Sequence, residues 1–132
     1  MTERELMELA IQARERAYVP YSQFKVGAAL LGADGQVYLG CNIENAAYGP
    51  TNCAERTAIF KAVSDGVRQF AALAVVADTE EPVAPCGVCR QVMAEFFDPD
   101  TPVYLGNLRG DLHQTTLKEL LPGAFTSRAL RR

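Results

Sequence analysis

The sequence lacks several features that whole classes of protein need. It has one histidine in 132 residues, and its 13 lysines and arginines form no run dense enough to follow a phosphate backbone. No apolar segment approaches the roughly 20 residues of a membrane helix, and the N-terminus lacks the apolar stretch of a signal peptide. We therefore expect no nucleic-acid partner, no membrane partner and a cytoplasmic location.

The length and composition fit one hydrophobic core. The chain is 48% hydrophobic with a net charge of only −3, and it has no internal repeat or linker-like segment. A chain of this length can close one core but is too short for two of ordinary size. We expect a single domain over residues 1–132.

Apolar periodicity predicts alternating helices and strands. Thr2 with Glu5 is a capping-box pattern ahead of a helix that runs towards Pro20, and Asp34-Gly35 is a hairpin turn signal. Strands are expected at 24–31, 36–42, 70–77 and 102–106, and further helices at 53–66, at 86–97 and in a short segment that begins at Thr116 and ends at 122–123. This order predicts an α/β fold with a single mixed β-sheet covered by helices.

Three of the four cysteines stand at predicted helix starts. Cys86 and Cys89 are three residues apart and therefore share one helix face, and Cys53 opens another helix. Helix N-termini favour the thiolate form that binds metal. Structural zinc sites normally have four ligands, so three cysteines leave one position for water. The pattern predicts one catalytic Zn²⁺ per chain.

Other interpretations of the cysteines remain open at this point. A disulfide scaffold requires a secreted protein, and a lone C-x-x-C also occurs in redox sites and in structural zinc sites. Cys41 is the only candidate fourth ligand, but it lies at a strand end and is expected to be a small buried residue. A redox pair at Cys86 and Cys89 leaves Cys53 unexplained. The single histidine, His113, lies in a predicted loop and is expected to be an incidental surface or structural residue.

Charged residues next to the cysteines are candidates for proton transfer. Glu55 lies two residues after Cys53, where a carboxylate can act as general base and acid; alternatively it caps the helix behind Asn52. Arg56 and Arg90 flank the cysteines, and either could donate hydrogen bonds to sulfur and tune the metal. For each arginine, a solvated surface charge is the alternative.

Two motifs carry a family resemblance. Thr51-Asn52-Cys53-Ala54-Glu55-Arg56-Thr57-Ala58 and Pro85-Cys86-Gly87-Val88-Cys89-Arg90-Gln91 resemble the zinc motifs of the cytidine deaminase family. The likeness extends over 18–22, 24–30 and 40–46, and so over nearly the whole chain. Cysteine at the first ligand position and the short chain are similar to the small homotetrameric class. The resemblance implies a cytidine deaminase-like fold and a homotetramer.

The resemblance also implies substrate-binding residues. Asn42 and Glu44 would bind the ribose hydroxyls, and Phe125 would stack on the pyrimidine ring of a neighbouring subunit, so that subunits share active sites. A polar turn and a core contact are the respective alternatives. The full set of implied substrate-binding positions is Phe24, Asn42, Glu44, Tyr48, Ala54 and Phe125.

The implied reaction is zinc-dependent hydrolytic deamination of cytidine and deoxycytidine to uridine and deoxyuridine, with release of ammonia, as in pyrimidine salvage. Zinc would activate a water molecule, and Glu55 would move its protons. A deoxynucleotide, a nucleoside antibiotic, a guanine-like base or a base in RNA is an alternative substrate. The lack of a basic surface disfavours RNA, and Glu44 beside the sugar would repel a phosphate.

Overall fold

The structure, a computed structural model that describes residues 1–130, is built on one five-stranded sheet in the order β2-β1-β3-β4-β5. Its strands are β1 (Val26–Gly32), β2 (Val37–Cys41), β3 (Phe70–Ala77), β4 (Pro102–Asn107) and β5 (Leu112–Thr116). The helices are α1 (Glu3–Arg14), α2 (Ala54–Ser64), α3 (Gly87–Phe96) and α4 (Leu117–Leu120), followed by a 3-10 turn, η1 (Ser127–Leu130).

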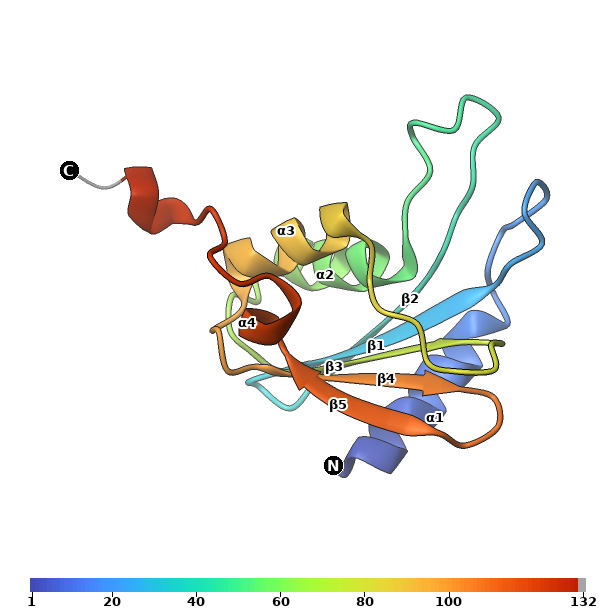
Figure 1. Cartoon of the computed structure of the whole chain (residues 1–132), viewed down its shortest axis with the longest axis horizontal. Helices are drawn as coiled ribbons and strands as arrows, with labels where there is room; N and C mark the ends of the chain where they lie inside the picture. Colours follow the sequence, from blue (N-terminus) through green and yellow to red (C-terminus); the bar gives the residue numbers. More distant parts are fainter. Residues whose placement is uncertain (131–132) are drawn as a thin grey trace.

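The sheet is mixed, which confirms the predicted fold class. β1 pairs antiparallel with β2 and β3, β3 runs parallel to β4, and β4 pairs antiparallel with β5. Figure 1 shows α2, α3 and α4 on one side of the sheet and α1 on the other. Within residues 1–130, no helix is both long and apolar enough to cross a membrane.

The alternation of side chains along the central strands creates two hydrophobic cores. On β1, Ala28 and Leu30 belong to the core under α2 and α3, whereas Ala29 belongs to the core under α1. β3 divides in the same way between Leu73 and Ala74. Because both faces of these strands are covered, their sequences are continuously apolar rather than alternating.

Most predicted elements are confirmed within two or three residues. The capping box is present: the Thr2 hydroxyl accepts from the Glu5 amide at 3.1 Å, and the Glu5 carboxylate accepts from the Thr2 amide at 2.9 Å. The predicted loop at His113 was wrong, because this residue lies on β5 opposite Leu105. The polar sequence Leu-His-Gln-Thr-Thr suits an edge strand, but it lacks the apolar alternation that identifies a strand.

A close contact between β2 and α2 fixes the start of α2. A Cβ atom placed on Gly40 would lie 2.3 Å from the Ala54 carbonyl oxygen and 2.6 Å from the Ala58 amide nitrogen. Only glycine leaves enough room for the two backbones to approach this closely. The helix that follows Cys53 is therefore held directly against the sheet.

Candidate metal centre and active site

The N-termini of α2 and α3 bring three thiols together. Cys53 and Cys86 are the N-cap residues of the two helices, both with extended backbone and neither with a side-chain capping bond. Cys89 is buried in the first turn of α3. The three sulfur atoms lie within 4.8 Å of one another. Since the N-cap side chains do not bond to the helix backbone, their sulfurs are free to bind a metal.

The geometry of the thiols fits zinc. The Cys53 and Cys86 sulfurs are 3.8 Å apart. Two thiolates bound tetrahedrally at about 2.3 Å from zinc would be separated by about 3.8 Å. Cys89 is buried, Cys53 half-buried and Cys86 exposed, so the cluster opens to solvent on one side. A substrate could reach the metal from that side.

Arg56 supplies positive charge to the cluster. Its Nη2 donates a hydrogen bond to the Cys53 sulfur at 3.2 Å. A hydrogen bond from the Cys89 thiol, supported by Arg56, lowers the pKa of Cys53 to about 5. The Nε atom of Arg56 is buried and has no partner among residues 1–130. A buried donor beside sulfur suits a site that becomes more negative when all three thiols ionise.

Glu55 is buried next to the thiols. Its exposed fraction is 4%, and this burial raises the pKa of its carboxyl group to about 7. The predicted alternative, a cap behind Asn52, is not present, because Cys53 is the N-cap and the Asn52 amide donates to the Thr57 hydroxyl at 3.1 Å. A carboxyl group that titrates near neutrality can both accept and release protons.

Of the two arginines that could donate to sulfur, Arg56 makes such a bond, whereas the hydrogen bonds of Arg90 within residues 1–130 go to backbone carbonyls. Its Nε donates to the Pro85 carbonyl at 2.8 Å, and its Nη1 donates to the Leu120 carbonyl at 2.7 Å. The next residue, Gln91, donates to the Phe125 carbonyl at 2.8 Å. Together these bonds connect the segment before Cys86 with the C-terminal segment after α4.

Cys41 stands apart from the three clustered thiols. It is the last residue of β2, it is half-buried, and it is not one of the three residues whose sulfurs cluster within the described part of the chain. Its carbonyl accepts a hydrogen bond from the Thr57 hydroxyl at 3.0 Å. The structure therefore gives Cys41 a place in the β2 to α2 connection but no place among the ligands.

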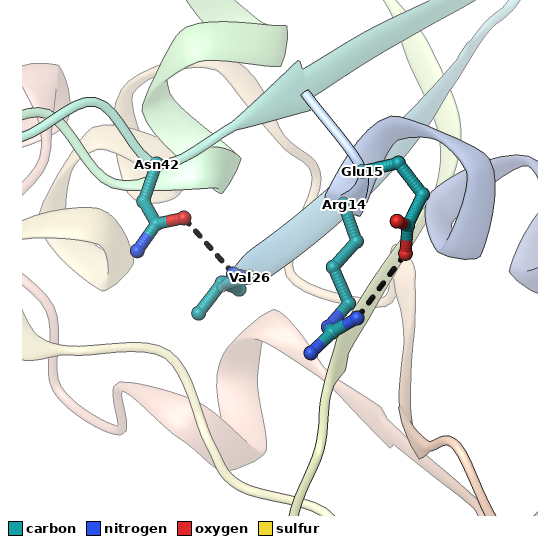
Figure 2. A network of polar contacts seen from close by, with 4 residues as sticks. All are labelled: Arg14, Glu15, Val26 and Asn42. Carbon is teal, nitrogen blue, oxygen red and sulfur yellow. Dashed lines mark hydrogen bonds and ion pairs between the residues drawn. The ribbon is translucent and has the colours of Figure 1, made fainter. Parts of the chain in front are cut away.

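The two predicted ribose-binding residues follow β2 and bond to the segment before β1. Figure 2 shows the Asn42 side-chain oxygen directed at the Val26 amide, 2.9 Å away. The Asn42 amide group also donates to the Phe24 carbonyl at 2.8 Å. Glu44 accepts from the backbone amides of Tyr21 and Ser22 at 3.0 and 3.1 Å.

The predicted aromatic contacts are unusually exposed. The exposed fractions are 42% for Phe24, 73% for Tyr48 and 61% for Phe125. Phe125 belongs to the segment after α4, and in Figure 1 this segment lies on the opposite side of the molecule from the long loops before β1 and after β2. The structure thus does not bring Phe125 to Phe24 and Tyr48 within one chain. Ala54 is fully buried directly after Cys53, and its carbonyl oxygen lies against Gly40 of β2.

A shallow cavity between the long loops adds residues that were not predicted as site residues. Its volume is about 430 Å³, and its lining consists of Tyr21, Ser22, Glu44, Tyr48 and Thr51. The rings of Tyr21 and Tyr48 meet edge to face, with centroids 6.2 Å apart. Tyr21 and Ser22 belong to the stretch 18–22 that carries the family resemblance, and this was the only signal that could have identified them.

Three cysteine ligands at two helix starts with a buried carboxyl beside them define the metal centre of a zinc hydrolase. Residues 1–105 match the cytidine and deoxycytidylate deaminase zinc-binding region. The chain belongs to this family, which confirms the predicted family and its zinc cofactor.

Named relatives and a solved structure are similar to this chain over most of its length. A cytidine deaminase of Sporosarcina psychrophila is 70% identical over 119 residues, which cover 90% of this chain and 88% of the relative. A cytidine deaminase of Halalkalibacterium halodurans is 66% identical over 127 residues, or 96% of each chain. The crystal structure of a cytidine deaminase from Burkholderia pseudomallei superposes with a TM-score of 0.92 at 57% identity, covering 95% of this chain and all of the other.

Proposed function

We propose that this chain hydrolyses the exocyclic amine of cytidine and deoxycytidine, giving uridine or deoxyuridine and ammonia. The observation that carries the proposal is the cluster of Cys53, Cys86 and Cys89 with the Glu55 carboxyl buried beside it. The high identity to named cytidine deaminases supports the pyrimidine nucleoside as substrate.

The chemistry divides between the thiols and Glu55. Zinc held by Cys53, Cys86 and Cys89 would supply Lewis-acid activation of water at neutral pH. Glu55 accepts a proton from the water whose oxygen attacks C4 of the pyrimidine. It delivers that proton to ring N3, then takes the second proton from the oxygen now bonded to C4 and passes it to the amine, so that ammonia leaves as the bond from C4 to nitrogen breaks. The hydrogen bond from Cys89 and, to a lesser extent, that from Arg56 favour the ionised form of Cys53 by lowering its pKa.

The proposed substrate contacts come from the segments on either side of the β1 to β2 hairpin. Asn42 and Glu44 bind ribose hydroxyls, because an amide and a carboxylate are suitable partners for them. Phe24 forms a wall of the nucleoside pocket and Tyr48 lies at its rim. Ala54 is the proposed contact to the base, because it directly follows Cys53 and the Watson–Crick edge of the base needs polar partners such as backbone groups.

The direct test follows the absorbance change of cytidine with purified protein. We expect conversion to uridine, about one zinc per chain, and loss of activity with a chelator. Glu55→Gln preserves side-chain volume and should retain zinc while turnover falls about 10² to 10⁴-fold. Glu95→Gln, an exposed position on α3, is the matched control. Full activity in Glu55→Gln would remove Glu55 from the mechanism, and stoichiometric zinc without conversion would refute the substrate.

The chain assembles into a homotetramer with shared active sites. The wide exposure of Phe125 and Tyr48 supports this assembly, because large aromatic side chains are seldom left in water. Phe125 completes the site of a neighbouring subunit. The predicted single domain spans residues 1–132, of which 131–132 lie outside the described residues. A reducing cytoplasm suits three thiolate ligands.

Complementation tests the shared site. Glu55→Gln and Phe125→Ala are co-expressed, so that a mixed oligomer contains sites with Glu55 from one variant and Phe125 from the other. We expect activity well above the sum of the two separate variants, together with a tetrameric mass in sedimentation. Simple additivity of the activities, or an active monomer, would contradict the assignment of Phe125.

A further inference from the structure

The loops on either side of the β1 to β2 hairpin form one connected unit. The segment before β1 and the segment after β2 pair through Tyr18, whose amide donates to the Asn42 carbonyl at 3.0 Å. The Tyr18 carbonyl in turn accepts from the Glu44 amide at 2.9 Å. In Figure 1 both segments project beyond the same end of the sheet. A change in one segment will therefore move the other.

The side chain of Asn42 completes the attachment at the base of this unit. It accepts from the Val26 amide and donates to the Phe24 carbonyl, at 2.9 and 2.8 Å. An asparagine amide group has two N–H donors and an oxygen with two lone pairs. One donor and one acceptor therefore remain for a substrate hydroxyl.

Ser22 occupies a central position in the same network. Its hydroxyl donates to Oε2 of Glu44 and accepts from the Phe24 amide at 3.0 Å. The other carboxylate oxygen, Oε1, accepts from the amides of Tyr21 and Ser22. One serine hydroxyl thus connects the proposed sugar-binding carboxylate with the proposed pocket wall.

The hydrogen bonds that Glu44 already accepts limit where its carboxylate can accept another one. A carboxylate oxygen offers two lone-pair sites, and both sites of Oε1 are occupied by backbone amides. Oε2 has one site filled by Ser22 and one left. The direction in which Glu44 can accept a further hydrogen bond is therefore set by the Ser22 hydroxyl.

We infer that Ser22 is a positioning residue for nucleoside binding: its hydroxyl holds the Glu44 carboxylate and the Phe24 backbone in the arrangement that receives the sugar. This inference rests on the proposed function. Ser22 itself is not part of the thiol cluster, which lies at the starts of α2 and α3. Its loss therefore weakens binding and leaves the chemical step intact.

The test compares Ser22→Ala with Ser22→Thr, which retains a hydroxyl. A charged hydrogen bond lost at Glu44 predicts a KM for cytidine about 10-fold higher in Ser22→Ala, with kcat within about 2-fold of wild type. Ser22→Thr should restore most of the KM. Ser64→Ala, at an exposed serine that ends α2, is the matched control, and zinc content and the unfolding midpoint verify the fold of each variant.

A second substrate separates positioning of Glu44 from a general loosening of the loops. 2′,3′-Dideoxycytidine lacks both ring hydroxyls, so Ser22→Ala should change its KM much less than the KM for cytidine. A double-mutant cycle with Glu44→Ala should show that the two substitutions are not additive. Three results would overturn the inference: an unchanged KM for cytidine in Ser22→Ala, an equal rise in KM for both nucleosides, or additive effects of Ser22→Ala and Glu44→Ala on KM. Failure of the proposed function looks different, because wild type itself would then leave cytidine unconverted.

Discussion

The contact between β2 and α2 predicts a large effect of a single methyl group. In Gly40→Ala, the added Cβ would lie 2.3 Å from the Ala54 carbonyl oxygen and 2.6 Å from the Ala58 amide nitrogen. Ordinary contact between such atoms is about 3.5 Å, so α2 has to move away from the sheet by about 1 Å. Overpacking of this kind costs about 3 kcal/mol of unfolding free energy, because backbone atoms cannot rotate aside.

Urea unfolding of the zinc-loaded protein measures this cost. With a denaturant slope of about 2 kcal/mol/M, the midpoint of Gly40→Ala should fall by about 1.5 M. Because Cys53 and Glu55 move with α2, zinc should also exchange faster to a chelator. Gly87→Ala is the matched control: its Cβ would meet nothing within 4 Å, so its midpoint should hardly change. A Gly40→Ala midpoint within about 0.3 M of wild type would refute the reasoning.

Three further substitutions test other parts of the structure. Cys41→Ala should leave zinc content at about one per chain, as measured by metal analysis, and a loss of half the metal would make Cys41 a ligand. Arg90→Ala should accelerate zinc release to a chelator, because the segment before Cys86 loses its bond to Arg90; a release rate equal to that of Arg109→Ala, an exposed control, would count against this role. Thr2→Ala should lower the unfolding free energy by about 1 kcal/mol through loss of the capping box in chemical denaturation, and no change would show that the start of α1 contributes nothing.

The metal ligands were predictable because each stands at a position that the sequence marks. Capping, turn and periodicity signals located the starts of α2 and α3, and the ligands occupy those starts. The same signals gave β3 its observed bounds, since a strand covered on both faces is apolar throughout. Family resemblance then supplied the substrate, which local patterns do not encode.

What the sequence could not predict are contacts between side chains and distant backbone. The carbonyl partner of Arg90 at Leu120 depends on how α3 packs against α4, and no spacing rule relates positions 30 residues apart. The hydrogen bond from the Ser22 hydroxyl to the Glu44 carboxylate was also not predicted, because it joins side chains more than 20 residues apart. β5 was missed because an edge strand can be polar on most of its surface.

The order of the strands has a consequence for how the protein folds. Cys53 lies in the connection between β2 and β3, and Cys86 lies in the crossover between the parallel strands β3 and β4. The hairpin of β1 and β2 is local and can form early, whereas β3 must pair with β1 across more than 35 residues before the helix starts can meet. The ligands are thus separate on the nascent chain and converge only late, so zinc should accelerate the last refolding phase and leave the first one unchanged.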